Sequence, residues 1–128
     1  MRRRWRQIAG VVGVYALLIA SGGCATKTAN VEDVALAIGE LALQVDSAEH
    51  AVVKAGLLTG ERQRVVSAGV LRLLYASRTF ERAVAAKQDH AIQLKELKGV
   101  VADLAKTTAN LGALSAAVDA VARAIGGL

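Results

Sequence analysis

The fold is decided by residues 31–55, VEDVALAIGELALQVDSAEHAVVKA, in which apolar residues recur every three or four positions. The series consists of Val31, Val34, Ile38, Leu41, Val45, Ala48, Val52 and Ala55. Such spacing places these residues on one face of an α-helix, as in the seam of a helical bundle or a coiled coil. Because Leu36 and Leu43 widen the apolar surface beyond a two-stranded seam, the pattern predicts a helix with more than one helical neighbour.

The residues around this stretch predict where the first helix begins and how the second one follows. Asn30 is a good N-cap, and Glu32 and Asp33 favour the positive end of the helix dipole. Gly56 suits the left-handed residue that ends many helices, and Thr59 suits the next N-cap. A short connection over 57–60 predicts an antiparallel second helix. We expect that helix to bury Val66, Val70, Leu73, Ser77, Phe80 and Val84, with Leu74 alongside and Tyr75 partly in the core.

The apolar register changes near residue 90. Lys87-Gln88-Asp89-His90 is a polar run of four residues at this change of register and predicts a turn or a sharp kink, with Asp89 as the candidate N-cap. Beyond it one register continues through Leu94, Leu97, Val101, Leu104, Thr108, Leu111, Ser115, Val118, Ala122 and Ile125. The sequence therefore predicts an all-α fold, a small antiparallel bundle of three long helices over 31–128, behind an N-terminal signal helix. Asn110 and Gly112 leave open whether the third helix is split near 110–112.

Residues 1–23 have the organisation of a secretory signal peptide. A basic head, with arginine at positions 2, 3, 4 and 6, precedes a continuous run of 13 apolar residues from Ile8 to Ala20. Small residues follow this run, as they do at a signal cleavage site. A membrane-spanning helix needs about 20 apolar residues. We therefore expect residues 1–23 to be removed.

The motif Ala20-Ser21-Gly22-Gly23-Cys24 resembles the lipobox of bacterial lipoproteins. The resemblance implies cleavage between Gly23 and Cys24 and acylation of Cys24, which is the only cysteine of the chain. Residues 24–30 would then be a lipidated tether. Ser21 stands where leucine is most common in this family, although small residues are tolerated there. Ala25 differs from the aspartate that retains many such proteins in the inner membrane, so the resemblance implies a position in the outer membrane, facing the periplasm.

An uncleaved signal anchor is the alternative interpretation of the same segment. Residues 7–26 carry no charge and have about the length that a bilayer crossing requires. The protein would then stay in the inner membrane as a membrane-active or lysis-accessory protein, with its amphipathic helices acting on the bilayer. Helices that seek membrane surfaces are usually strongly basic, which the body of this chain is not.

The net charge of +5 is concentrated in the predicted signal peptide. Four of the 16 basic residues lie in residues 1–23, which contain no acid, so the remainder carries 12 basic and 11 acidic side chains. No basic stripe interleaved with aromatic residues follows residue 23. Because such stripes create the electrostatic footprint of nucleic-acid binding, we expect no nucleic-acid partner.

The sequence nominates no catalytic, cofactor-binding or metal-binding residues. His50 and His90 are the only histidines, and we interpret both as surface residues without a carboxylate cluster at ligand spacing. Asp89 and His90 are adjacent, so their side chains point apart and do not suit acid–base work. The body broadly resembles the small alanine-rich helical lipoproteins of Gram-negative genomes and prophages. That resemblance implies a non-enzymatic binding or structural module with a protein partner in the envelope, and self-association stays open.

Overall fold

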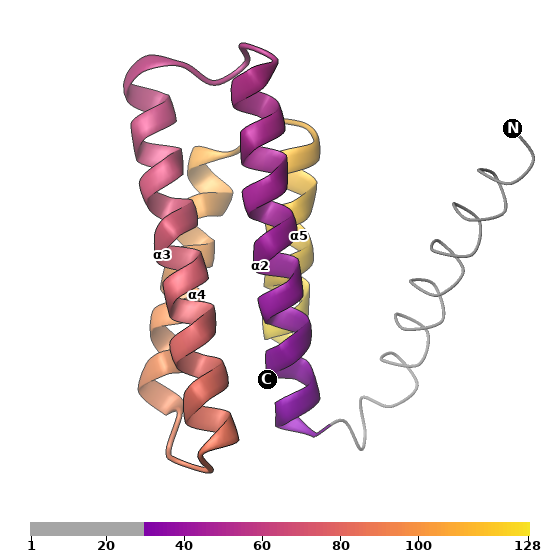
Figure 1. Cartoon of the computed structure of the whole chain (residues 1–128), viewed down its shortest axis with the longest axis vertical. Coiled ribbons are helices and arrows are strands. Elements are labelled where there is room, and N and C mark those ends of the chain that lie inside the picture. The colour runs from indigo at the N-terminus through magenta and orange to yellow at the C-terminus, as the bar shows by residue number, and fades with distance from the viewer. Residues whose placement is uncertain (1–29) are drawn as a thin grey trace, which may run out of the picture. The chain divides into compact units, whose positions relative to one another are not determined.

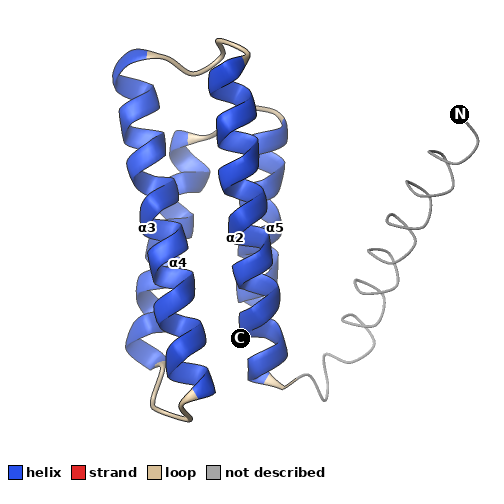
Figure 2. Ribbon diagram, viewed as in Figure 1, coloured by secondary structure: helices blue, strands red, loops and turns tan. Residues whose placement is uncertain are grey.

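The computed structural model describes residues 30–128, which form four helices in the order α2 (Val31–Lys54), α3 (Gly60–Ala85), α4 (Ala91–Thr107) and α5 (Ala113–Gly126). The helices form a ring in which α2 contacts α3 and α5, while α4 contacts α3 and α5. Consecutive helices run in opposite directions, with α2 and α3 in front of α5 and α4 in Figure 1. Short loops connect them, and the described residues contain no strand (Figure 2). The predicted all-α bundle is confirmed, and it has four helices because the third predicted helix is divided into α4 and α5.

The beginning of α2 and its connection to α3 follow the sequence prediction. The helix begins directly after Asn30. Gly56 has a φ of 76°, and the N–H groups of Gly56 and Leu57 donate to the carbonyls of Val53 (3.0 Å) and Val52 (3.1 Å). This is the Schellman arrangement of a helix C-terminus. Thr59 occupies the N-cap position of α3 in an extended conformation, but its side chain makes no capping hydrogen bond.

The buried face of α2 is rotated relative to the predicted seam. Its fully or nearly buried apolar residues are Ala35, Ile38, Ala42, Val45 and Val52, while Val31, Val34, Leu41 and Ala48 are half-buried and Ala55 is exposed. Leu36 and Leu43 are 54% and 58% exposed and lie outside the core. The prediction that this helix has more than one helical neighbour is confirmed, because α2 contacts both α3 and α5. The buried arc of α2 lies between its two neighbours, where small alanines let the helices approach closely.

The prediction for α3 is confirmed at almost every position. The six residues expected in the core are buried, and Leu74 is half-buried beside them. Tyr75 is the exception, because 72% of it is exposed and it does not belong to the core.

The polar run after α3 is a turn, as predicted. The N–H groups of Lys87 and Gln88 donate to the carbonyls of Val84 (3.0 Å) and Ala83 (2.9 Å), which repeats the Schellman arrangement. The N-cap position of α4 is His90 and not Asp89. Asp89 nevertheless caps the helix, since its Oδ1 accepts a hydrogen bond from the Ala91 N–H at 3.1 Å.

We expect Lys87→Gly to stabilise the fold by about 0.5–1 kcal/mol. Lys87 holds a φ of 55°, where its Cβ is strained and glycine is not. The added freedom of glycine in the unfolded chain offsets part of the gain. Chemical denaturation should show a higher midpoint with an unchanged slope. Ala86→Gly is the matched control, because Ala86 has a φ of −79° and gains nothing from glycine. A Lys87→Gly variant no more stable than Ala86→Gly would contradict the prediction.

The C-terminal part is split into α4 and α5, which settles the alternative left open at 110–112. Asn110 and Gly112 have φ values of 69° and 54°, so the chain reverses there. Arg62 of α3 donates to the carbonyl oxygens of Thr107 (3.3 Å) and Ala109 (3.0 Å) and thereby holds the end of α4. The continuous register predicted beyond the reversal is wrong at two positions, because Ser115 is only half-buried and Ala122 is exposed. The buried residues of α5 are Leu114, Val118, Val121 and Ile125.

Candidate functional site

The predicted lipidation residue Cys24 and the cleavage site that it forms with Gly23 lie outside the described residues. The same holds for the predicted signal peptide, 1–23, and for the tether up to residue 29. Among the helices of residues 30–128, none is both long enough and apolar enough to cross a membrane.

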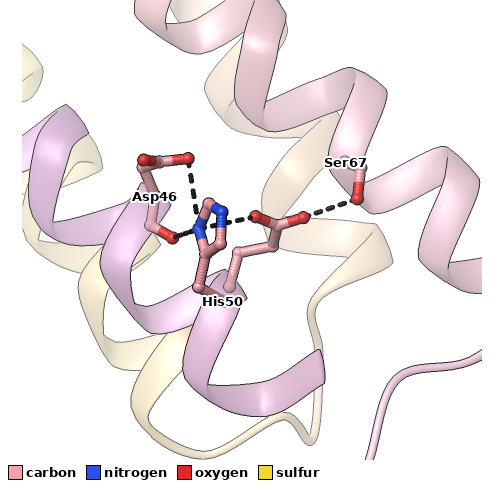
Figure 3. Close-up of polar contacts among 4 residues, drawn as sticks. Asp46, His50 and Ser67 are labelled. Atoms are coloured by element: carbon pink, nitrogen blue, oxygen red, sulfur yellow. Dashed lines mark hydrogen bonds and ion pairs between the residues drawn. The ribbon is translucent and has the colours of Figure 1, made fainter. Parts of the chain in front are cut away.

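A polar cluster joins α2 to α3 on the outside of the bundle (Figure 3). The His50 Nδ1–H donates to the backbone oxygen of Asp46 at 2.8 Å. The same nitrogen lies 3.4 Å from Glu49 Oε2 and 3.6 Å from Asp46 Oδ1. Glu49 is only 7% exposed, and its other carboxylate oxygen accepts a hydrogen bond from the Ser67 hydroxyl of α3. The carboxylate of Glu49 is therefore held from both sides, by its own helix and by the neighbouring one.

The cluster corrects the expectation that no carboxylates stand at ligand spacing from a histidine. Asp46, Glu49 and His50 can bring one ligand atom each within 4.8 Å of one another, because positions i, i+3 and i+4 share a helix face. A divalent cation could use Nδ1 of His50 as a ligand only after that nitrogen had lost its proton and its hydrogen bond to the Asp46 carbonyl. As it stands, the cluster is an ion-pair and hydrogen-bond network between two helices, and we assign no metal to it.

We expect the stability contribution of His50 to disappear as the pH rises above about 6.5. The hydrogen bond to the Asp46 carbonyl, followed by the charges of Asp46 and Glu49, raises the pKa of His50 above its usual 6.5. A raised pKa means that protonated His50 stabilises the fold fully below the unfolded pKa and that this contribution disappears as the pH rises through the folded pKa. Thermal unfolding should show a larger difference between the wild type and His50→Gln at about pH 6 than at about pH 8.5. A difference that grows toward alkaline pH would contradict this sign.

His90 is not the surface histidine that the sequence suggested. It is half-buried, and its ring meets the ring of Phe80 edge-on, with centroids 5.4 Å apart and planes at 81°. The contact joins the N-terminal end of α4 to α3. Asp89 is turned toward the Ala91 N–H, so the structure places these adjacent residues in separate structural contacts.

An open groove of about 560 Å³ runs between α3 and α4. Its apolar surface is formed by Leu71, Tyr75, Ala76, Gly99 and Val100. Arg72 lines it from α3, and Glu96 and Asp103 line it from α4. Leu71 and Tyr75 are 66% and 72% exposed, so the groove is an apolar surface open to solvent. The sequence did not predict this groove. The pattern along one helix does not show which exposed residues of the neighbouring helix lie beside it.

Comparison of the chain with protein-family models, with curated proteins and with solved structures finds no match. Function is therefore inferred from the residues of this chain alone.

Proposed function

We propose that the protein is a small lipoprotein of the bacterial cell envelope, anchored through acylated Cys24. The observation that carries the proposal is the order of the N-terminal residues: a basic head, a short apolar run, small residues and the only cysteine of the chain. A helical bundle begins at Val31, so residues 25–30 would separate the lipid from the folded body. Stable anchoring requires two or more acyl chains. The lipoprotein class that this motif resembles carries such chains at the cysteine.

The folded body acts in this proposal as a non-catalytic binding or structural module. Its polar cluster connects two helices, and an apolar groove between α3 and α4 is open to solvent. Exposed apolar surfaces rimmed by charged residues are typical of protein interaction sites. Ala25 supports an outer-membrane position facing the periplasm. An uncleaved anchor in the inner membrane is the second candidate, favoured by the absence of charge in residues 7–26.

The test is metabolic labelling of cells with a fatty-acid probe, followed by mass spectrometry of the mature protein. We expect the wild type to be labelled, to begin at Cys24 and to lack residues 1–23, because the cysteine thiol is the acceptor of the lipid. Cys24→Ser should lose the label and keep the uncleaved N-terminus. Thr26→Ser is the matched control, a conservative change two residues away that should leave labelling intact.

Two results would refute the lipoprotein proposal. The first is Cys24→Ser protein that is labelled as strongly as the wild type. The second is an intact Met1 together with an unmodified Cys24, which would favour the uncleaved anchor.

A further inference from the structure

Gly99 has no structural reason to be glycine within a single copy of the bundle. It lies in the interior of α4, where glycine is the least favourable residue after proline. A Cβ added to it would meet nothing within 4 Å, and its backbone does not have a positive φ. Gly99 lines the groove between α3 and α4. Glycine at such a place allows close approach of another molecule.

The groove also carries charges of opposite sign that are not used within the chain. Arg72 stands on the α3 side, and Glu96 and Asp103 stand on the α4 side. Within residues 30–128 the ion pairs are those of His50 and of Arg64 with Glu61, so these three groove charges have no ionic partner. An occupant of the groove would therefore meet one arginine on the α3 wall and two carboxylates on the α4 wall.

We propose that a second copy of this chain occupies the groove, related by a two-fold axis parallel to the helices. Such an axis lays α3 of one copy along α4 of the other, so Arg72 faces the partner's Glu96 and Asp103. An axis perpendicular to the helices would instead lay α3 on α3 and bring two Arg72 side chains together. A two-fold interface must be complementary to itself, and this groove supplies both signs of charge.

The positions of the residues along the axis of the bundle, here called their heights, agree with this pairing. Gly69 lies level with Leu104, and Phe80 lies level with His90, so the stretch from Arg72 to Tyr75 lies level with residues near Gly99. An axis parallel to the helices preserves height. Tyr75 of each copy, which is 72% exposed, is therefore placed over the partner's Gly99. A large, rigid and partly polar ring of this kind is common at protein interfaces.

The expected dimer is weak. Two helices about 10 Å wide and about 25 Å long present on the order of 500 Å² per copy, whereas a standard interface buries about 800 Å² per partner. The parallel axis also puts both Val31 residues at the same end of the dimer. Where both copies are tethered to one membrane, the tether raises their effective concentration. Only this last step rests on the proposed function.

The first experiment is sedimentation of residues 25–128, without lipid, over concentrations up to millimolar. The core lies between Ala35 and Ile125, so this body contains all of it. We expect a concentration-dependent dimer. Arg72→Glu and Asp103→Arg should each weaken it by roughly tenfold or more, and the double variant should recover part of the loss. Arg123→Glu is the matched control, because it makes the same charge change at an exposed position of α5, a helix that does not line the groove.

Gly99→Leu separates the interface from a role in folding. Leucine favours the helix over glycine, so the unfolding temperature of the monomer should rise. The same side chain fills the space for the partner's Tyr75, so the dimer should weaken. Opposite signs in the two measurements are the expected result, and Tyr75→Ala should weaken the dimer without lowering the unfolding temperature.

The second experiment tests the pairing in the full chain. Copies of different size, one with Tyr75→Cys and one with Gly99→Cys, both in a Cys24→Ser background, should form a mixed disulfide when coexpressed and oxidised. A body that is monomeric at every concentration would overturn the proposal, and so would a dimer indifferent to Gly99→Leu and Arg72→Glu. These results do not depend on acylation, so they are distinguishable from a failure of the lipoprotein proposal.

Discussion

Replacing Phe80 with alanine is expected to lower the free energy of unfolding by about 3–5 kcal/mol. The side chain is fully buried, and it is the only phenylalanine of a chain in which 3% of residues are aromatic. The rest of the core consists of small and aliphatic side chains, which cannot fill a cavity of this size without moving whole helices. Small domains are stable by only about 5–15 kcal/mol. Phe80→Ala should therefore remove a large share of the free energy of unfolding. Chemical denaturation measures this loss.

The loss has a second component at the contact with His90. Phe80 meets that ring edge-on, and aromatic pairs contribute about 0.5–1.5 kcal/mol beyond the area that they bury. Tyr75→Ala is the matched control, because it also removes an aromatic ring from α3 but at a position that is 72% exposed. Its effect on the monomer should stay within about 0.5 kcal/mol. Equal effects of the two substitutions would show that the burial assigned to Phe80 is wrong.

The core face of α3 was predictable from the sequence, whereas that of α2 was not. In α3 the apolar residues at positions 66, 70, 73, 80 and 84 keep helical spacing with only Ser77 interrupting them, and arginines occupy the other side together with the exposed Val65 and Leu71. In α2 leucine and alanine occur on neighbouring positions, and a hydrophobic pattern favours the leucines. Close packing of two helices favours the small residues instead, which is why Ala35 and Ala42 are buried while Leu36 and Leu43 are exposed.

The polar cluster was only half visible in the sequence. The spacing of Asp46, Glu49 and His50 places them on one face of any helix. The contact of Glu49 with Ser67, however, depends on how far α2 and α3 are shifted along each other, and no pattern within one helix fixes that shift. The groove between α3 and α4 was missed for the same reason. Its residues are ordinary exposed positions until the two helices are placed side by side.

Leu58→Ala is expected to cost about 2–5 kcal/mol, although residues 57–60 were predicted only as a connection. The structure places Leu58 in the loop between α2 and α3, fully buried and part of the core cluster. The side chain closes one end of the bundle, where the loop itself offers few other apolar groups. Truncating it leaves a cavity and opens that end to water.

Leu57 provides the matched control, since it is the same residue type one position earlier and is 67% exposed. Leu57→Ala should change the free energy of unfolding by no more than about 0.5 kcal/mol. The two variants have the same composition and the same change in helix propensity, and both lie in the loop after Gly56. A difference between them can therefore arise only from burial. Denaturation curves that coincide for the two variants would contradict the position of Leu58 in the core.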